Sequence, residues 1–209
     1  MKLAVFGATG GTGRQLIVQA IAAGHTVTAL ARSHHHKLPA AAGMTVLLGS
    51  SGDRSSVVQA VAGQEAVLCA LGGRPWRRRE EVCSSATRHI LPAMREHGVR
   101  RLVAISTFGA GDTRPLVGPV ARALVFGVIL RSEVADKEAM EAQIAASDVD
   151  WTIVRVGVLN DGPRTGVYRA RDDGSVRGMG KISRADVANF ILSELNAKAW
   201  LRRRPVLMY

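Results

Sequence analysis

Short apolar runs recur along the chain and are separated by helical stretches. The apolar runs predict strands over residues 2–6, 26–31, 45–48, 66–70, 102–105 and 151–154, with a short final strand over 205–208. The stretches between them predict helices over residues 12–23, 55–62, 82–96, 132–146 and 184–195. Strands that alternate with helices are typical of a parallel sheet covered on both faces. The pattern therefore predicts an α/β fold of the Rossmann type, a doubly wound parallel sheet in a single domain over residues 1–209 with small substrate-covering loops.

Residues at the ends of the predicted helices support these boundaries. Gly24 and Gly98 each follow a helix and suit the left-handed conformation in which many helices end. Ser183 precedes the last helix as a candidate N-cap, and Asp53 or Ser55 could cap the short second helix.

Three long connections interrupt the alternation. The stretches 72–81 and 107–131 follow the ends of predicted strands, at the sheet edge where doubly wound proteins bind ligands. Long connections at this edge are more often functional than not. The stretch 160–183 is rich in glycine, and we predict that it is partly extended.

Composition narrows the class of protein without naming a function. The net charge of +11 could serve nucleic acid or a pocket for an anionic cofactor. No recognition-helix, zinc or aromatic-stacking pattern accompanies the arginines, so we expect no nucleic-acid partner. Cys69 and Cys83 lack disulfide-framework spacing, and the first strand leaves no room for a signal peptide, which together predict a cytoplasmic protein. The longest apolar stretch, 123–130, is too short to span a bilayer and predicts a buried or pocket-lining helix, with no membrane partner.

A glycine-rich loop follows the first strand and opens the first helix. Its sequence is Gly7-Ala8-Thr9-Gly10-Gly11-Thr12-Gly13. Gly7 permits a tight turn, Gly10 lets the backbone approach a pyrophosphate, and Gly13 allows close packing of helix on strand. The free amides and the dipole at the helix start attract phosphates. Because the strand before and the helix after the loop are both present, the motif predicts a dinucleotide site.

The end of the second strand indicates which dinucleotide binds. Sites for NAD place an acid there for the ribose 2′-hydroxyl, whereas sites for NADP place an arginine nearby. This chain has Arg32 and Ser33, and Lys37 follows three histidines. These residues predict NADPH, with a solvated basic loop as the alternative. Residues 34–36 are consecutive histidines that do not converge easily on one ion, so we expect no metal site.

Several segments resemble a known family. They are 2–13, 27–32, 61–67, 97–103, 161–168 and 182–188. Together they resemble the atypical short-chain dehydrogenase/reductases, and within them the flavin reductase and biliverdin reductase B branch with its bacterial NAD(P)-binding and NmrA-like relatives. The resemblance implies an NAD(P)-dependent fold with the nicotinamide over the carboxyl edge of the sheet.

The resemblance also assigns residues by position. It implies that Ala70-Leu71-Gly72 lies along the cofactor ribose and that Val156-Gly157-Val158 faces the nicotinamide amide. It implies that Ser106 and Thr107 lie near the nicotinamide and the substrate.

The chain departs from the family in three places. Ser50 and Ser51 follow the third strand, where relatives often carry an aspartate near the adenine. The Tyr-x-x-x-Lys motif has Glu133 in place of its tyrosine and retains Lys137. The two tyrosines of the chain, Tyr168 and Tyr209, lie outside this motif, and Glu141 lies near the place of a histidine found in flavin reductase.

The candidate catalytic residues each have a structural alternative. Ser106 could orient an acceptor carbonyl or bond to backbone, and Thr107 shares this ambiguity. Lys137 could contact the nicotinamide ribose or a substrate oxygen, or form an exposed pair with Glu133 or Glu141.

The candidate substrate contacts are aromatic. Trp76 lies among arginines in a loop that could be a substrate lid or a mobile surface loop, and Phe108 follows the fifth strand. Two further residues are predicted to be core: Cys69 and Trp151.

Three hypotheses of function follow. The first is an NADPH-dependent reductase that acts on a planar conjugated small molecule such as a flavin, a quinone or a polyketide-type aromatic, which needs no dedicated protein acid. The absence of the tyrosine disfavours ordinary alcohol–ketone chemistry. The second is a non-enzymatic NADPH-binding or redox-sensing protein, and the third is a non-redox isomerase or cyclase. The oligomeric state, monomer or homodimer, stays open.

Overall fold

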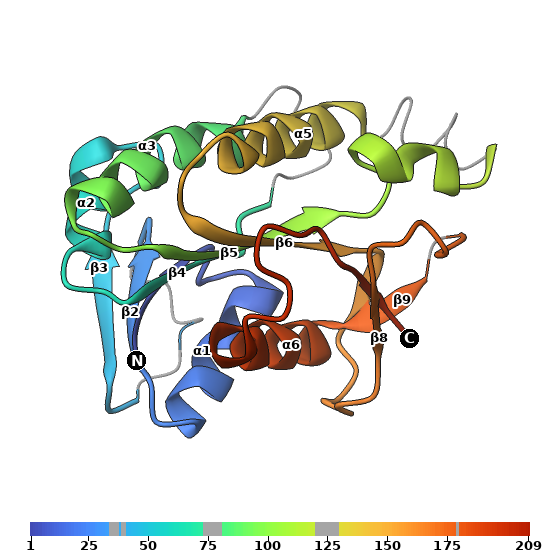
Figure 1. Ribbon diagram of the computed structural model, residues 1–209. Helices are drawn as coiled ribbons and strands as arrows, with labels where there is room; N and C mark the ends of the chain where they lie inside the picture. The colour runs from blue at the N-terminus through green and yellow to red at the C-terminus, as the bar shows by residue number, and fades with distance from the viewer. Residues whose placement is uncertain (34–37, 39–40, 73–80, 120–129, 179) are drawn as a thin grey trace.

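A computed structural model describes residues 1–33, 38, 41–72, 81–119, 130–178 and 180–209 (Figure 1). Its main sheet has eight strands in the order β3-β2-β1-β4-β5-β6-β10-β8. These strands are β1 Lys2–Phe6, β2 Thr26–Ala31, β3 Met44–Leu48, β4 Ala66–Cys69, β5 Arg101–Thr107, β6 Asp150–Val156, β8 Arg169–Arg171 and β10 Val206–Met208. All neighbouring pairs are parallel except β8 and β10. The order reverses between β1 and β4, which is the switch point of a doubly wound sheet and confirms the predicted Rossmann-type fold.

Helices cover both faces of this sheet. They are α1 Gly11–Ala22, α2 Arg54–Val61, α3 Val82–Glu96, α5 Arg131–Ala145 and α6 Arg184–Ala197. In Figure 1, α3 and α5 lie on one face of the sheet, while α1 and α6 lie on the other. Leu3 and Val5 of β1 pack in the core cluster beneath α1 and α6, and Ala4 and Phe6 pack in the cluster beneath α2 and α3. A strand buried on both faces explains why the run 2–6 is continuously apolar.

The helix-end predictions are confirmed. Gly24 and Gly98 have φ angles of 79° and 67° just after α1 and α3. Asp53 rather than Ser55 caps α2 by accepting from the amide of Ser56, and Ser183 caps α6 by accepting from the amide of Asp186.

Several short elements escaped sequence analysis. The stretch 160–183 is partly extended, as predicted, and contains β8 and β9 Lys181–Ser183. Strand β7 Val158–Asn160 pairs with β9 in a separate two-stranded sheet. A 3-10 helix, η1 Gly111–Leu116, follows β5. Three-residue strands carry too little periodicity for detection, because their pairing partners lie far away in sequence.

Several residues to which the sequence analysis gave a role lie outside the described residues. These are Lys37 and the histidines at 34–36, Trp76 with its neighbouring arginines, and most of the apolar stretch 123–130. No helix in the described ranges is long and apolar enough to cross a membrane.

Candidate dinucleotide and substrate site

The glycine loop lies at the switch point, where the ends of β1 and β4 meet. Gly7 has a φ of 80°, and a Cβ atom placed there would overlap the carbonyl group of Ala70. A Cβ atom on Gly13 would overlap the carbonyl oxygen of Gly7. The amide of Gly10 donates to the Gly7 carbonyl at 3.0 Å and closes the turn. Side chains at Gly7 and Gly13 are therefore excluded by backbone atoms, as the phosphate-loop interpretation requires.

The first helix begins without a side-chain cap. Its N-cap is Gly10, no side chain bonds to the helix start, and the first turn holds no acidic residue. By contrast, Asp53 and Ser183 cap α2 and α6. Thr9 and Gly10 are exposed beside this helix start. Unsatisfied amides at the positive end of a helix dipole bind anions, so the loop fits the pyrophosphate of a dinucleotide.

The predicted cofactor residues gather along one edge of the sheet, because parallel strands end on the same side. Each follows the carboxyl end of a strand in the order from β3 to β6. They are Ser50 and Ser51 after β3, Arg32 and Ser33 after β2, Gly7 to Gly13 after β1, Ala70, Leu71 and Gly72 after β4, Ser106 and Thr107 ending β5, and Val156, Gly157 and Val158 at the end of β6 and the start of β7. Arg32 and Ser33 are both exposed.

Lys137 of α5 links the segment after β4 to the end of β5. Its Nζ atom donates to the carbonyl oxygens of Leu71 and Ile105, each at 2.7 Å, and the residue is 4% exposed. The alternative of an exposed pair with Glu133 or Glu141 is wrong, because α5 turns this residue toward the sheet. An ammonium group has three donors, so one remains after the two carbonyl bonds.

Ser106 and Thr107 differ in their hydrogen bonding. Ser106 is 1% exposed, and its hydroxyl oxygen has no hydrogen-bond partner among the described residues. Thr107 donates to the carbonyl oxygen of Phe108 at 3.2 Å. Backbone thus satisfies Thr107 but not Ser106. A buried hydroxyl without a partner costs free energy, and it calls for an explanation such as a ligand contact.

Phe108 packs in a small core cluster with Val117, Val134 and Val206 and is 1% exposed. The burial of Phe108 does not test its predicted contact with substrate, which stays a prediction. Cys69 and Trp151 are buried, as predicted. Burial raises the pKa of the Cys69 thiol and, for Cys83, raises the pKa to about 12, so neither thiol is activated.

Both tyrosines lie on the side of α6, away from α5. The Tyr168 hydroxyl donates to Asn189 at 2.8 Å, and the Tyr209 hydroxyl donates to Asp186 at 2.8 Å. Neither substitutes for the tyrosine that is replaced by Glu133. The position of Glu141 is also explained, since this buried carboxylate accepts two hydrogen bonds from Arg155.

Sequence analysis missed Arg184 as a candidate site residue. It is the first residue of α6, and its side chain crosses the glycine loop so closely that a Cβ atom on Gly11 would lie 2.5 Å from its Cδ atom. Its guanidinium pairs with Asp161 at 2.8 Å, and the side chain is 28% exposed. The local sequence around Ser183 and Arg184 does not predict this contact, because the contact depends on the packing of α6 against α1.

A glycine turn and an uncapped helix at the switch point of this sheet define a dinucleotide-binding protein of the Rossmann type. A family model described as NAD(P)H-binding matches residues 7–198, and the chain belongs to that family.

Known relatives agree with this assignment. A 2-alkyl-3-oxoalkanoate reductase of Stenotrophomonas maltophilia is 30% identical over 164 residues, which are 74% of this chain and 49% of the relative. The chain therefore spans about half the length of that relative. ChuY, an anaerobilin reductase from Escherichia coli O157:H7, is 26% identical, and its structure superposes with a TM-score of 0.82 over 100% of this chain and 97% of that one. A short-chain dehydrogenase/reductase from Veillonella parvula in complex with NADP shares the fold at 19% identity, with a TM-score of 0.83 over 100% of this chain and 94% of that one.

Proposed function

We propose that the protein is an NADPH-dependent reductase that transfers a hydride to a planar conjugated small molecule, such as a flavin, a quinone or a polyketide-type aromatic. The observation that carries this proposal is the combination of a dinucleotide loop with an α5 helix that keeps Lys137 and lacks the tyrosine acid. An acceptor of this class can take its proton from solvent, whereas a ketone benefits from a positioned acid. The reductase names of two relatives support the reaction class.

The choice of NADPH rests on Arg32. This residue follows β2 with no acid beside it, and an exposed guanidinium can form a bidentate contact with a 2′-phosphate. When bound, the cofactor supplies the hydride. The uncapped start of α1 holds its pyrophosphate, and Arg184, whose side chain lies against Gly11, adds a positive charge.

Lys137 of α5 and Ser106 near the end of β5 position the nicotinamide and the acceptor. Lys137 holds the chain after β4 against the end of β5, and its third N–H is available to the ribose. Ser106 supplies its unpaired hydroxyl to an acceptor carbonyl. Because the residue is 1% exposed, an acceptor reaches it only after the neighbouring side chains move.

The test is consumption of NADPH and of NADH, followed at the nicotinamide absorbance, with a panel of flavins and quinones. We expect turnover with NADPH, a reduced kcat in Ser106→Ala, and an unchanged Kd for NADPH in this variant. Ser175→Ala, at an exposed position outside the site, is the matched control. An equal kcat in wild type and Ser106→Ala would return this hydroxyl to a structural role.

The burial of Ser106 and Lys137 favours one alternative, a non-enzymatic NADPH sensor. Tight NADPH binding without turnover of any acceptor would support the sensor and contradict the reductase. Turnover that is independent of the redox state of the cofactor would instead indicate an isomerase or cyclase.

A further inference from the structure

The inner face of α5 begins with an acidic residue, Glu133, in the first turn of the helix. Lys137, Met140 and Ile144 mark this face, because all three are buried against the sheet. Successive residues of a helix are about 100° apart, so Glu133 points within about 40° of each of them. The side chain of Glu133 is therefore directed toward the sheet side of the helix rather than toward the outer surface.

Along the helix axis, Glu133 lies beyond the packed part of the sheet. The strands β5 and β6 are parallel neighbours that α5 connects, so this helix begins at the carboxyl edge of the sheet and runs back. Lys137 bonds to the Ile105 carbonyl, and Glu133 lies four residues, about 6 Å, nearer that edge. Lys137 is 4% exposed, whereas Glu133 is only partly buried. Glu133 therefore overlooks the region beyond the strand ends where doubly wound proteins bind ligands.

Ser106 faces the same helix. Side chains alternate along β5: Ala104 packs in the core cluster under α3 and α5, and Ile105 packs in the cluster on the other face. Ser106 continues this alternation and turns toward α5, as does its register partner Arg155, which bonds to Glu141 of that helix. The hydroxyl proposed to orient the acceptor and the acidic residue of α5 therefore lie on the same side of the sheet.

The surroundings of Glu133 favour its protonated form. Partial burial raises the pKa of its carboxyl, the charge of Lys137 lowers it, and the charge of Asp136 raises it, with a net upward shift. Asp136 is fixed in place, because its carboxylate accepts from the amides of Cys83 and Ser84 at the start of α3, each at 2.8 Å. An acid whose pKa is raised toward the working pH is suited to proton transfer.

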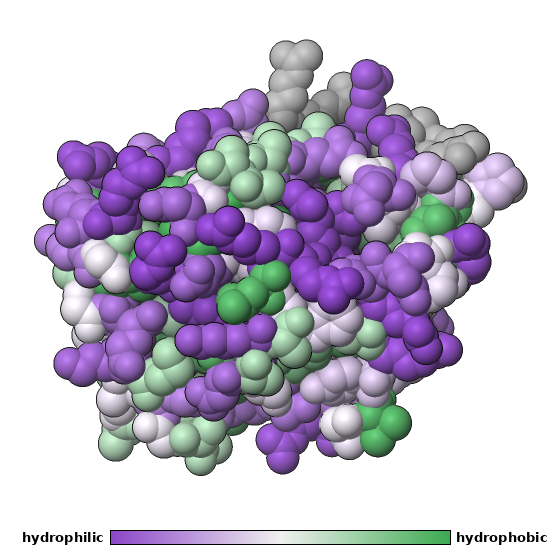
Figure 2. Space-filling model, viewed as in Figure 1, coloured by the Kyte–Doolittle hydropathy of each residue, from purple (hydrophilic) through white to green (hydrophobic). Residues whose placement is uncertain are grey.

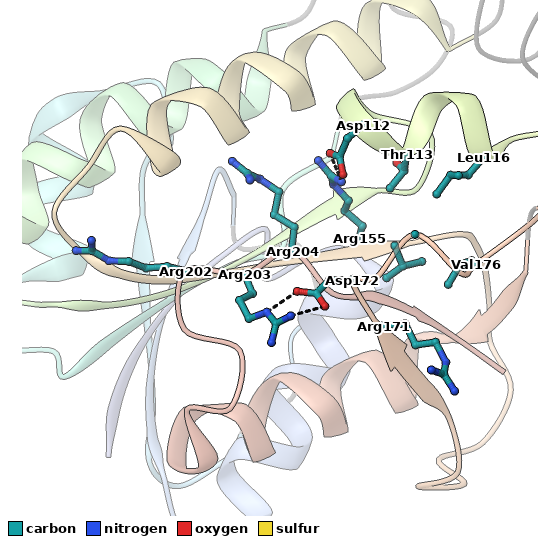
Figure 3. Close-up of a pocket in the computed structure, with 12 residues that line it drawn as sticks. Asp112, Thr113, Leu116, Arg155, Arg171, Asp172, Val176, Arg202, Arg203 and Arg204 are labelled. Atoms are coloured by element: carbon teal, nitrogen blue, oxygen red, sulfur yellow. Dashed lines mark hydrogen bonds and ion pairs between the residues drawn. The ribbon is translucent and has the colours of Figure 1, made fainter.

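Within the described ranges, the other elements packed around α5 add little net charge. The thiols of Cys69 on β4 and Cys83 on α3 are neutral, because burial raises the pKa of each. Arg155 of β6 is bound to Glu141 and to Asp112 of η1, and Figure 3 shows the contact with Asp112. Asp112 is 80% exposed, and the flank between the two helix layers is mostly hydrophilic in Figure 2, so solvent screens its charge. The ionisation of the acid is therefore set mainly by burial and by its neighbours on α5.

We propose that Glu133 is the general acid of the reductase and donates its carboxyl proton to the acceptor. The carboxyl loses its O–H bond and a new O–H or N–H bond forms on the acceptor, which is reduced by a hydride from NADPH while the cofactor is oxidised to NADP⁺. The carboxylate then regains a proton from water, which its partial exposure allows. This inference rests on the proposed function, and it names the group through which the solvent proton reaches the acceptor.

The ionisation of Glu133 is measured in the protein without cofactor. The side-chain carboxyl resonances of the glutamates are followed by ¹³C spectroscopy during a pH titration, and the resonance of Glu133 is identified by its absence in Glu133→Gln or Glu133→Asp. We expect its pKa to lie above the ordinary glutamate value of about 4.3. A pKa at or below that value would overturn the proposal, whatever the activity of the protein.

The catalytic role is measured from the pH profile of NADPH oxidation with the flavin or quinone that gives the highest turnover. We expect the kcat of wild type to fall as the pH rises through the pKa of Glu133 in the complex, because only the protonated carboxyl donates. Glu133→Gln should lose this dependence, with a kcat about a hundredfold lower and an unchanged Kd for NADPH. Glu96→Gln, which removes an exposed carboxylate at the end of α3, is the matched control and should behave as wild type.

The outcomes distinguish this inference from the proposed function. Absence of turnover in wild type with every acceptor would refute the reductase, and the role of Glu133 with it. Turnover in wild type with the same kcat and pH profile in Glu133→Gln would refute the role of Glu133 alone. A lower kcat with an unchanged pH profile would also overturn the proposal, because it would show that Glu133 positions other groups and transfers no proton.

Discussion

Replacing Lys137 by methionine tests whether one buried ammonium group stabilises the contact between the segment after β4 and the end of β5. The two carbonyl groups that it joins belong to chain segments after β4 and at the end of β5, which flank the proposed nicotinamide position. Methionine keeps most of the apolar stem and removes the charge and its donors.

The magnitude follows from the two bonds. A hydrogen bond to a charged group contributes about 1.5–3 kcal/mol, so two contribute about 3–6 kcal/mol. Loss of the ammonium also removes the cost of burying a charge, which offsets part of this sum. We therefore expect the free energy of unfolding to fall by about 2–4 kcal/mol.

The assay is urea denaturation monitored by circular dichroism. A loss of this size lowers the midpoint by about 1–2 M urea at a slope of about 2 kcal/mol per molar, the middle of the usual range. Lys2→Met is the matched control, because Lys2 is exposed at the start of β1. If both variants lose the same small amount, below about 0.5 kcal/mol as for most surface substitutions, the reasoning on Lys137 is refuted.

Three further predictions concern charged residues. Arg32→Ala should raise the Kd for NADPH far more than the Kd for NADH in calorimetric titrations, because only NADPH carries the 2′-phosphate; equal losses would rule out the assignment of NADPH. Arg184→Gln should raise both dissociation constants by a similar factor, about tenfold or more, because a pyrophosphate is common to both cofactors; an effect on NADPH alone would contradict this placement. Burial raises the pKa of Asp186, but hydrogen bonds from Gly166, Tyr209 and Thr165 outweigh it and lower this pKa. A carboxyl whose pKa is lowered on folding stabilises the fold at any pH above its ordinary, unfolded pKa, and this contribution is lost as the pH falls through the lowered pKa. Wild type should therefore lose stability below a pH of about 4 more steeply than Asp186→Asn in unfolding experiments. Parallel acid profiles would show that Asp186 contributes nothing.

The sequence alone determined the framework of this protein. Continuous apolar runs such as residues 2–6 are the local signature of strands buried on both faces, and the helix ends at Gly24, Asp53 and Ser183 are set by neighbours within a few residues. The glycine loop could be identified for the same reason, since its turn, the preceding strand and the following helix are contiguous. These features depend on local backbone preferences, which a sequence displays directly.

Tertiary structure decided what the side chains meet. The spacing of α5 left Lys137 equally suited to an exposed ion pair, and only the packing of this helix on β4 and β5 turned it inward. Arg184 came to the glycine loop because α6 packs against α1, and Arg204 came to Trp151 because the final strand joins β6. Contacts between residues so far apart depend on how whole elements dock, and no short-range pattern in the chain records them.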